Sequence, residues 1–512
     1  MRSDDDRTRT HVPLTSGTMV SHYRIIEKIG AGGMGEMYEA KNAGSIIRRR
    51  RTDFGKIWKD SAAPRIIMKG ITMITHISHC LRKTQSGSLL LLIVLFLILG
   101  KDASGNDGNA SMPGTFGPEV FKQRRLALLD SLGDGMAVIY SKGSAGEMGY
   151  RADGDFWYLT GLDDSGAILL LAPKEKHRAV LLLAPRDPEE ERWVGERASL
   201  TESLKVALQV DYISRTSGLD WWLISRVRHS PVLHLISQLV GPSAAIPPDM
   251  ELYNKVADRI PGTTVKNSTR FLESMRAHKT PEEIAAIEEA IEITHQGLSE
   301  SLSMIKPGIT EFQLAGKLEQ SFRDRGAQYV SFPSIVGGGE HSTVLHYEKL
   351  DKAIPPGELV LIDCGAEWNH YAADVTRTFP VGGKFTDFQA KIYDIVLEAQ
   401  KAAITSIKPG ISMDSVDAIA RSVIRKAGYA DAFIHSTSHF LGVEVHDAGD
   451  SWQPLAPGMV ITVEPGIYVQ DAKIGVRIED DVLVTPDGSR VLSARIPKER
   501  QDIEMWMTQD GR

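Results

Sequence analysis

Short apolar runs separated by turn residues fill the middle of this chain and predict alternating helices and strands. The segment 121–140 (FKQRRLALLDSLGDGMAVIY) predicts a helix that ends near Gly133, followed by a strand. Three further apolar segments, DFWYLTG, AILLLAP and AVLLLAP, are predicted as strands because turn residues separate them. This first module, residues 111–267, is therefore expected to be a small α/β domain.

A second module, residues 268–508, contains an internal repeat. Its first long helix is predicted to start at Thr280, because threonine serves as an N-cap, Pro281 suits the first turn and Glu283 completes a capping box. The sequence IKPGI then occurs at 305–309 and again at 407–411, each time between two amphipathic helices. This pattern predicts two related α–β halves, so a site between them would draw residues from both.

The helix after each copy of the repeat ends at a glycine, Gly326 in the first half and Gly428 in the second, as a helix C-terminus favours. Strand-rich segments follow both helices. Two matching helices around each turn make a chance repeat of IKPGI a poor explanation. The whole body is therefore expected to have an α+β fold.

Composition adds few constraints to this pattern. The 512 residues carry a net charge of −7 and 42% hydrophobic residues, which is ordinary for a folded protein and gives no indication of nucleic-acid binding. The two cysteines, Cys80 and Cys364, lie in different parts of the chain, so no disulfide is expected in the body. Cys364 is expected to be a small core residue.

One segment does not have a globular pattern. Residues 89–99 (LLLLIVLFLIL) are uninterrupted apolar residues, preceded by basic residues such as Arg82 and followed by small residues around Ala103. Residues 68–110 therefore resemble a secretory signal peptide, and eleven residues are short for a membrane span of about 20. We expect an exported protein, periplasmic or secreted. An uncleaved membrane tether through 89–99 is the alternative, as is a cytoplasmic protein if the segment is not used.

Residues 1–67 contain a glycine-rich motif. Gly30, Gly32 and Gly35 form G-x-G-x-x-G, which resembles the loop that opens bacterial serine/threonine protein kinases. The resemblance covers some twenty residues, and no other kinase motif follows in a kinase-like order, so a kinase function is not expected. We interpret this region as a fragment that is disordered or that results from a misplaced start.

Acidic residues interrupt several of the apolar strands in the second module. The interrupting side chains lie in the segments LIDCGAEW, YAADVTRTF, ITVEPGIY and GVRIEDD, and a histidine lies in STSHFLGVEVHD: Asp363, Asp374, Glu464, Glu479 and His439. Two like charges about 4 Å apart cost roughly 4 kcal/mol at an effective dielectric near 20, so four carboxylates in one core require cations. Two divalent ions would balance them, and carboxylates with one histidine suit Mn, Co, Zn or Fe(II). The pattern predicts a two-metal hydrolase.

These same segments resemble the pita-bread metallopeptidases, and specifically the Xaa-Pro aminopeptidase (aminopeptidase P) branch. The resemblance extends over about 116–491, and RADGDFWYLTG resembles the creatinase-like amino-terminal domain of that branch. It implies a pita-bread catalytic domain in which Asp374 and Glu479 bridge two ions, Asp363 binds one, and His439 and Glu464 complete the other. A water or hydroxide held between the ions would be the nucleophile. The metal implied is manganese, with zinc, cobalt or iron as alternatives.

The resemblance also assigns roles around the metals. Glu464 would accept and relay the proton of the nucleophile, while His346 and His446 would hold the carbonyl oxygen and the developing tetrahedral charge. Arg477 is expected to support Asp363, with Tyr468 as a further candidate for the same surroundings. Trp157 is expected either to line the substrate entrance or to be a buried aromatic residue.

The expected activity is removal of the first residue from peptides with proline in second position. A prolidase, which cleaves only Xaa-Pro dipeptides, uses the same site and is the nearest alternative; a non-catalytic pita-bread binding module is a more distant one, since no ligand position is lost. The family resemblance also implies a homodimer or homotetramer.

Overall fold

The computed structural model describes residues 19–20, 23–32, 35–42, 45–47, 116–146, 149–237, 241 and 243–509. The chain divides into two compact units, Met1–Ser104 and Gly105–Arg512. The apolar segment 89–99 and the rest of the predicted signal region lie outside the described residues. Among the helices that the structure describes, none is long and apolar enough to cross a membrane.

The described part of the first unit is a small antiparallel sheet, in a stretch for which no ordered domain was expected. Its strands pair in the order β1-β2-β3-β4. The glycines of the G-x-G-x-x-G motif lie where β2 and β3 meet, since Gly32 pairs with Gly35. The strands are β1 (Met19–Val20), β2 (Tyr23–Gly32), β3 (Gly35–Asn42) and β4 (Ser45–Ile47).

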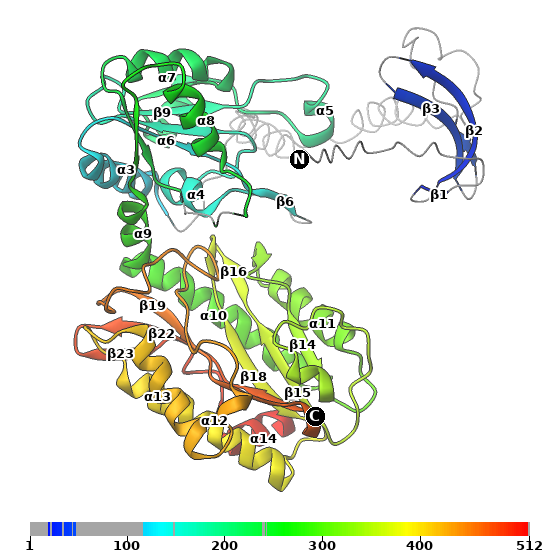
Figure 1. Cartoon of the computed structure of the whole chain (residues 1–512). Helices are drawn as coiled ribbons and strands as arrows, with labels where there is room; N and C mark the ends of the chain where they lie inside the picture. The colour runs from blue at the N-terminus through cyan, green and yellow to red at the C-terminus, as the bar shows by residue number, and fades with distance from the viewer. Residues whose placement is uncertain are drawn as a thin grey trace, which may run out of the picture. The chain divides into compact units, whose positions relative to one another are not determined.

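The second unit begins with a domain built on a six-stranded mixed sheet, which includes β9 (Figure 1). The strands pair in the order β10-β9-β8-β5-β11-β12. The strands are β5 (Met136–Tyr140), β8 (Ile168–Leu171), β9 (Ala179–Leu183), β10 (Tyr212–Arg215), β11 (Val232–Leu235) and β12 (Thr264–Asn267). The helices are α3 (Pro118–Leu132), α4 (Gly154–Thr160), α5 (Glu191–Val194), α6 (Glu202–Leu208), α7 (Leu219–Val227) and α8 (Pro248–Ala257). A hairpin of β6 (Ser144–Gly146) and β7 (Gly149–Arg151) completes it.

Alternate residues of these strands pack into two different cores, which explains their continuous apolar runs. Leu169 and Leu171 join the core that includes α3 and α6, whereas Leu170 joins the core formed with α7 and α8. Because successive side chains of a strand point to opposite faces, helices must cover both faces of this sheet. The predicted α/β character of this domain follows from that layering.

The segment DFWYLTG is a helix, α4, and the prediction of a strand there was wrong. The Asp153 side chain caps the helix by accepting a hydrogen bond from the Asp155 amide at 3.1 Å. Gly161 ends it in the left-handed conformation, with φ 70°, and its amide donates to the Trp157 carbonyl. All of its residues but Asp155 are buried, so the sequence has no polar face from which a helical period could be read.

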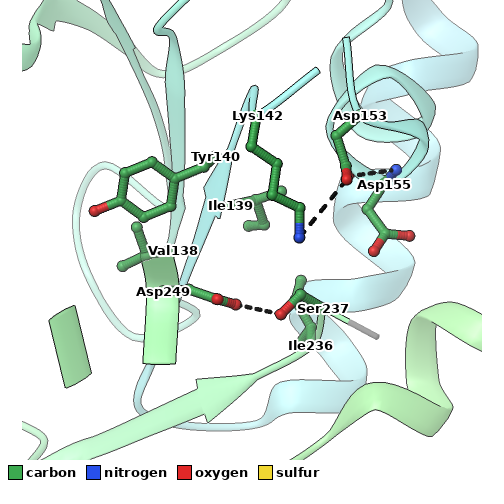
Figure 2. Close-up of a pocket in the computed structure, with 9 residues that line it drawn as sticks. All are labelled: Val138, Ile139, Tyr140, Lys142, Asp153, Asp155, Ile236, Ser237 and Asp249. Carbon is green, nitrogen blue, oxygen red and sulfur yellow. Dashed lines mark hydrogen bonds and ion pairs between the residues drawn. The ribbon is translucent and has the colours of Figure 1, made fainter. Parts of the chain in front are cut away.

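A small hollow lies beside the end of β5, near Ser237 at the end of β11 (Figure 2). Its volume is about 10 Å³, which is space for about one water molecule. The Lys142 ammonium lies 3.6 Å from the Asp153 carboxylate, and Ser237 donates to Asp249 at 2.5 Å. The first contact ties the start of α4 to the segment after β5, and the second ties the segment after β11 to the start of α8.

The rest of the chain follows α9 (Thr269–Ala277) and has the two expected halves. The first half contains α10 (Pro281–Leu302), α11 (Glu311–Asp324), β13 (Tyr329–Val330), β14 (Ile335–Gly338), β15 (Leu359–Cys364), β16 (Ala366–Trp368), β17 (Tyr371–Ala372) and β18 (Val375–Pro380). The second contains α12 (Asp387–Ser406), α13 (Met413–Lys426), β19 (Val460–Val463), β20 (Gly466–Val469), β21 (Ile474–Arg477), β22 (Asp480–Thr485) and β23 (Gly488–Val491). Helix α14 (Arg500–Gln509) follows.

The two IKPGI turns make the same hydrogen bonds. The amide of Gly308 donates to Ile354 and the amide of Ile354 donates to Ile309, at 3.1 and 2.8 Å. In the second copy the amide of Gly410 donates to Leu455 and the amide of Leu455 donates to Ile411, at 2.8 Å each. In both turns the glycine has a φ near +90°, which glycine adopts without steric cost. The repeat in the sequence therefore corresponds to a repeat in the structure.

Helix ends also follow the prediction. Thr280 and Glu283 form a capping box at the start of α10, and Gly326 and Gly428 follow α11 and α13 with positive φ. Helix pairs α10/α11 and α12/α13 pack together within their own halves. Strands β18 and β21 join the halves, since Thr378 donates to the Arg477 carbonyl and accepts from its amide.

We expect Thr280→Ala to lower the free energy of unfolding by about 1 kcal/mol, because the Glu283 amide loses its side-chain acceptor. Thr280→Ser keeps the hydroxyl and should retain most of that stability. Urea unfolding of the three proteins followed by circular dichroism would measure the difference, and equal stabilities for Ala and Ser variants would contradict this role of the cap.

Candidate metal centre

An antiparallel strand pair brings the first two acids together. Strand β15 pairs with β18 so that Asp363 lies opposite Thr376 and Cys364 lies opposite Val375. Asp374 directly precedes β18, at the same end of this pair. Cys364, the neighbour of Asp363, is fully buried in the apolar core, as expected for alternating side chains.

The second half supplies its acids from two breaks in strands. Glu464 lies between β19 and β20, and Glu479 lies between β21 and β22, while β20 pairs with β21 and β19 pairs with β22. His439 is fixed beside them because its amide donates to Thr462 at 3.1 Å. A break in a regular strand frees each glutamate from strict alternation, so both can face the same space.

That space is a cavity of about 470 Å³. Eight residues predicted from the sequence line it, drawn from both halves of the repeat: His346, Asp363, Asp374, His439, His446, Glu464, Arg477 and Glu479. Apolar side chains, among them Phe332, Leu345 and Val445, form part of the same wall. The arrangement of acids, imidazoles and apolar surface in one concave site is typical of a small-molecule or peptide site.

The distances place ligand atoms of three candidates within reach of a common centre, with a fourth nearby. Ligand atoms of Asp374, His439 and Glu479 all lie within 4.8 Å of one another. The Nε2 atom of His439 lies 3.4 Å from Asp374 and 3.6 Å from Glu464. Its Nδ1 atom lies 3.0 Å from the Phe440 carbonyl, which can only accept, so Nδ1 carries the hydrogen and Nε2 offers its lone pair.

Two carboxylate oxygens in this cluster have no hydrogen-bond partner although they are buried, Oδ1 of Asp363 and Oδ1 of Asp374. Buried polar atoms are normally paired, so these oxygens require a partner that is not a protein donor. Carboxylate oxygens and one neutral imidazole are a donor set that divalent cations accept. The residues therefore fit a metal centre.

The carboxylates of the cluster are buried and repel one another, and both effects raise the pKa of Asp374 and of Glu479. Burial raises the pKa of Asp374 well above its usual value, and Glu479 and Asp363 raise it further. Burial likewise raises the pKa of Glu479, with Glu464 and Asp363 adding to the effect. For His439, burial lowers the pKa to about 4, which keeps the imidazole neutral and able to bind a cation.

Arg477 supports the carboxylate cluster through hydrogen bonds, as expected from the sequence. Its guanidinium donates to Asp363 at 2.5 Å, to the Tyr468 hydroxyl at 2.9 Å and to Thr376 at 3.0 Å. Thr376 in turn donates to Glu479 at 2.6 Å. The arginine thus fixes one carboxylate directly and a second through the threonine hydroxyl.

Sequence reasoning did not identify His435, which also lines the cavity. Its Nε2 lies 2.8 Å from the Tyr468 hydroxyl and its Nδ1 lies 3.7 Å from Glu464. Burial, with Arg477 nearby, lowers its pKa to about 4. Its position four residues before His439, in the same serine- and threonine-rich segment, is the signal that could have indicated it.

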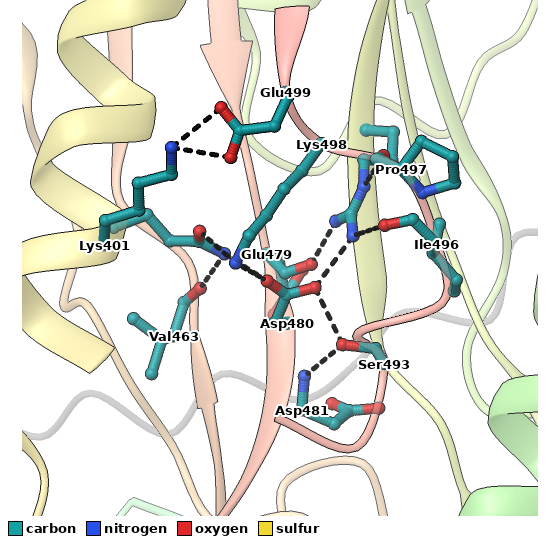
Figure 3. Close-up of polar contacts among 12 residues, drawn as sticks. Lys401, Val463, Glu479, Asp480, Asp481, Ser493, Ile496, Pro497, Lys498 and Glu499 are labelled. Carbon is teal, nitrogen blue, oxygen red and sulfur yellow. Dashed lines mark hydrogen bonds and ion pairs between the residues drawn. The ribbon is translucent and has the colours of Figure 1, made fainter. Parts of the chain in front are cut away.

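The acids that follow Glu479 have different surroundings (Figure 3). Asp480 is fully buried and accepts from Arg377 at 2.8 Å, Lys498 at 2.5 Å and Ser493 at 2.7 Å. Arg377 also donates to the Glu479 carbonyl, so this ion cluster fixes the backbone of a metal-ligand candidate. Asp481 accepts from the amide of Asp374 at 3.2 Å.

Trp157 lies outside the cavity lining. It is fully buried, its ring stacks on His370 with centroids 4.3 Å apart, and Phe116, Phe121 and Tyr371 surround it. The expectation that Trp157 is a buried aromatic residue therefore describes its position. Helix α4 places the side chain in the core between α3 and the first half of the repeat.

A buried group of four carboxylates and a neutral histidine, shared by two halves and open to a cavity, defines a metal-dependent hydrolase. Comparisons with known proteins agree. Residues 285–486 match metallopeptidase family M24, and residues 121–233 match the N-terminal domain of aminopeptidase P.

The Xaa-Pro aminopeptidase of Escherichia coli is 33% identical over 431 residues, which cover 76% of this chain and 97% of that protein. A solved structure of zinc-substituted aminopeptidase P of Escherichia coli, in complex with product, superposes with a TM-score of 0.68 at 32% identity, covering 78% of this chain and 99% of that one. The Xaa-Pro dipeptidase of Pyrococcus furiosus is 42% identical over 226 residues, 43% of this chain and 64% of that protein.

The chain belongs to the aminopeptidase P branch of metallopeptidase family M24. The family, the pita-bread fold with its preceding domain, and the enzyme class of metal-dependent exopeptidase were all predicted from the sequence, and these comparisons confirm them. The family implies divalent metal ions without identifying which metal is bound.

We expect Asp480→Asn to lower the free energy of unfolding by about 3–5 kcal/mol, because it leaves the buried Arg377 and Lys498 charges without their carboxylate. Asp394→Asn is a matched control, since that aspartate makes an exposed pair with Arg500 and should cost less than about 1 kcal/mol. Urea unfolding of both variants tests this, and equal losses would contradict the importance of the buried cluster.

Removal of metal should make stability fall with rising pH. Burial raises the pKa of Glu464 to about 8 from an ordinary value of 4.5, Asp363 adds to the rise and Arg477 opposes it. A raised pKa means that folding favours the protonated form, so its stabilisation is complete below pH 4.5 and is lost as pH rises through 8. Asp374 and Glu479 act in the same direction.

The measurement is urea unfolding of chelator-treated protein at pH 5 and pH 9, and the expected loss at pH 9 is on the order of a few kcal/mol, since one pKa unit corresponds to about 1.4 kcal/mol. Glu464→Gln, which removes one titrating group, should show a smaller loss. A stability independent of pH in the chelated wild type would contradict the repulsion described for this cluster.

Proposed function

We propose that this enzyme removes the N-terminal residue from peptides that have proline in the second position. The observation that carries the proposal is the set of five metal-ligand candidates on one cavity wall, in a chain that aligns with nearly the full length of an Xaa-Pro aminopeptidase. Asp363, Asp374, His439, Glu464 and Glu479 would hold two divalent ions. When bound, such ions activate water and polarise the scissile carbonyl.

The residues around the metals would accept a proton and stabilise the negative charge that develops on the substrate. Glu464 is the proton acceptor in this proposal, because its carboxylate lies beside both His439 and His435 at the cavity wall. His346 and His446 line the cavity and would donate to the carbonyl oxygen as negative charge develops on it. Burial, with His346 nearby, lowers the pKa of His446, so it acts as a neutral donor.

Arg477 stays positively charged, and its role is to fix a neighbouring carboxylate. Burial alone would lower its pKa, but Tyr468 and Asp363 raise it well above the usual value. A permanently charged guanidinium on Asp363 fixes the direction of that carboxylate. Asp363 therefore presents its second, unpaired oxygen to the cavity.

Proline in the second position makes the scissile bond a tertiary amide, which has no N–H to donate. The apolar wall formed by Phe332, Leu345 and Val445 offers surface for a pyrrolidine ring without demanding such a donor. The preference for proline rests on the family, and the cavity is compatible with it.

A prolidase is the alternative favoured by a specific observation, the 42% identity to an Xaa-Pro dipeptidase over 226 residues. The two activities differ in the space beyond the proline, where a longer peptide must pass. A non-catalytic binding module is disfavoured because every ligand position of the family is present.

The remaining features of the proposal concern the metal, the assembly and the location. Manganese is proposed because the donors are mostly carboxylate oxygens with one imidazole. A homodimer or homotetramer is proposed from the family resemblance. Export, with cleavage or retention of the apolar segment 89–99, is proposed from the sequence of that segment.

We expect metal-dependent release of arginine from Arg-Pro-Pro, measured by chromatography with Mn²⁺ and with chelator, and little cleavage of Gly-Pro. Glu479→Gln should lose metal and activity together, whereas Glu340→Gln, an exposed residue paired with Lys352, should retain both. Cleavage of the dipeptide alone would assign a prolidase. No cleavage of either peptide by metal-loaded enzyme would refute the proposed substrate class.

A further inference from the structure

The loop 440–449 carries His446 and Val445 to the cavity wall, yet several of its polar attachments lie outside the metal centre. Within the loop, Asp447 donates its amide to the Phe440 carbonyl at 3.0 Å. Its carboxylate, adjacent in sequence to His446, is completely buried. A buried carboxylate requires cationic or hydrogen-bond partners, and their identity decides what holds the loop.

The first partner is Arg276 of α9, the helix between the two domains. One guanidinium nitrogen donates to Asp447 at 2.5 Å and the other donates to Asp155 of α4 at 2.6 Å. Glu444, also in the loop, lies 3.4 Å away. Arg276 is 4% exposed and the Asp447 carboxylate is buried, so the pair between them is shielded from solvent.

The second partner is Lys279, whose ammonium lies 3.1 Å from the other oxygen of Asp447. Its own amide donates to the Gly458 carbonyl, which anchors the lysine to the second half of the repeat. Burial would raise the pKa of Asp447, but Arg276 and Lys279 lower it below the usual value, so the carboxylate is ionised. The two cations therefore hold it from two sides.

The amino-terminal domain makes a second, separate attachment to the loop. Arg151 of β7 donates to the Val443 carbonyl at 2.7 Å, while its Nε contacts both oxygens of Glu367 at 2.9 Å. On the same domain, Asp153 caps α4 and pairs with Lys142, which leaves the Asp155 carboxylate for Arg276 (Figure 2).

The backbone at two glycines lies very close to these charged groups. A Cβ atom on Gly442 would lie 2.1 Å from the Asp447 carboxylate and 2.8 Å from the Lys279 side chain. A Cβ atom on Gly154 of α4 would lie 2.9 Å from both Arg276 and Glu444. A side chain at either position would displace the charged groups, so both glycines leave the space that the ion cluster occupies.

We propose that Arg276, with Lys279, is a positioning residue for His446: it ties the loop 440–449 to α9 and to the amino-terminal domain through Asp447. The amino-terminal domain is then part of the apparatus that orients the active site. This inference rests on the proposed function only where it predicts turnover, since the attachment itself is a property of the fold.

The test compares Arg276→Met with Arg226→Met. Arg226 is equally buried in the amino-terminal domain and contacts His177 and Trp222, far in sequence from the loop, so it controls for the loss of a buried guanidinium. Arg276→Lys and Asp447→Asn are added as conservative variants. All are made in the full chain.

The first readout is hydrogen exchange followed by mass spectrometry. In Arg276→Met, peptides that cover 440–449 should exchange roughly tenfold faster while those of β15 and β18 are unchanged, because loss of the ion pair permits local opening. Asp447→Asn should give the same result, and Arg226→Met should not change the loop. Unchanged exchange of the loop in Arg276→Met and in Asp447→Asn would overturn the proposal, whatever the substrate is.

The second readout is steady-state hydrolysis of Arg-Pro-Pro. With metal content equal to wild type, Arg276→Met should lower kcat by about 10- to 100-fold with KM changed by less than about 3-fold, because a misplaced group costs rate more than binding. Arg276→Lys should recover part of kcat. Faster loop exchange with kcat unchanged would overturn the positioning role, and inactivity of the wild type itself would refute the proposed substrate instead.

Discussion

Electrostatic repulsion among buried carboxylates is the constraint around which this catalytic domain is arranged. Asp363, Asp374, Glu464 and Glu479 meet where the two halves of the repeat join, and burial raises the pKa of the last three. The protein supplies one permanent cation, Arg477, directly on Asp363. The remaining charge is left for metal ions, so the fold stores an unfavourable interaction that cation binding relieves.

The run Glu479-Asp480-Asp481 shows how the chain controls three consecutive acids in one buried strand region. Glu479 faces the cavity, Asp480 is neutralised by Arg377 and Lys498, and Asp481 accepts from the amide of Asp374. Each acid thus has a different electrostatic task. The neighbours of a metal ligand fix its backbone and so help to keep its side chain directed at the cavity.

Much of this architecture could be predicted from the sequence because it depends on local signals. The capping box at Thr280, the repeated IKPGI turns and the acids within apolar strands are each visible over a few residues. The helix at Trp157 was not predictable, because a wholly buried short helix has no amphipathic period. The Arg276–Asp447 pair depends on a contact between segments 171 residues apart, and no local pattern records it.

The matching hydrogen bonds of the two IKPGI turns show that each half is built on the same plan, yet neither half contains a complete donor set. Asp363 and Asp374 come from one copy, and His439, Glu464 and Glu479 from the other. Either half on its own would therefore present an incomplete donor set. Assembly of this junction, rather than the folding of one half, is the step that creates the metal centre.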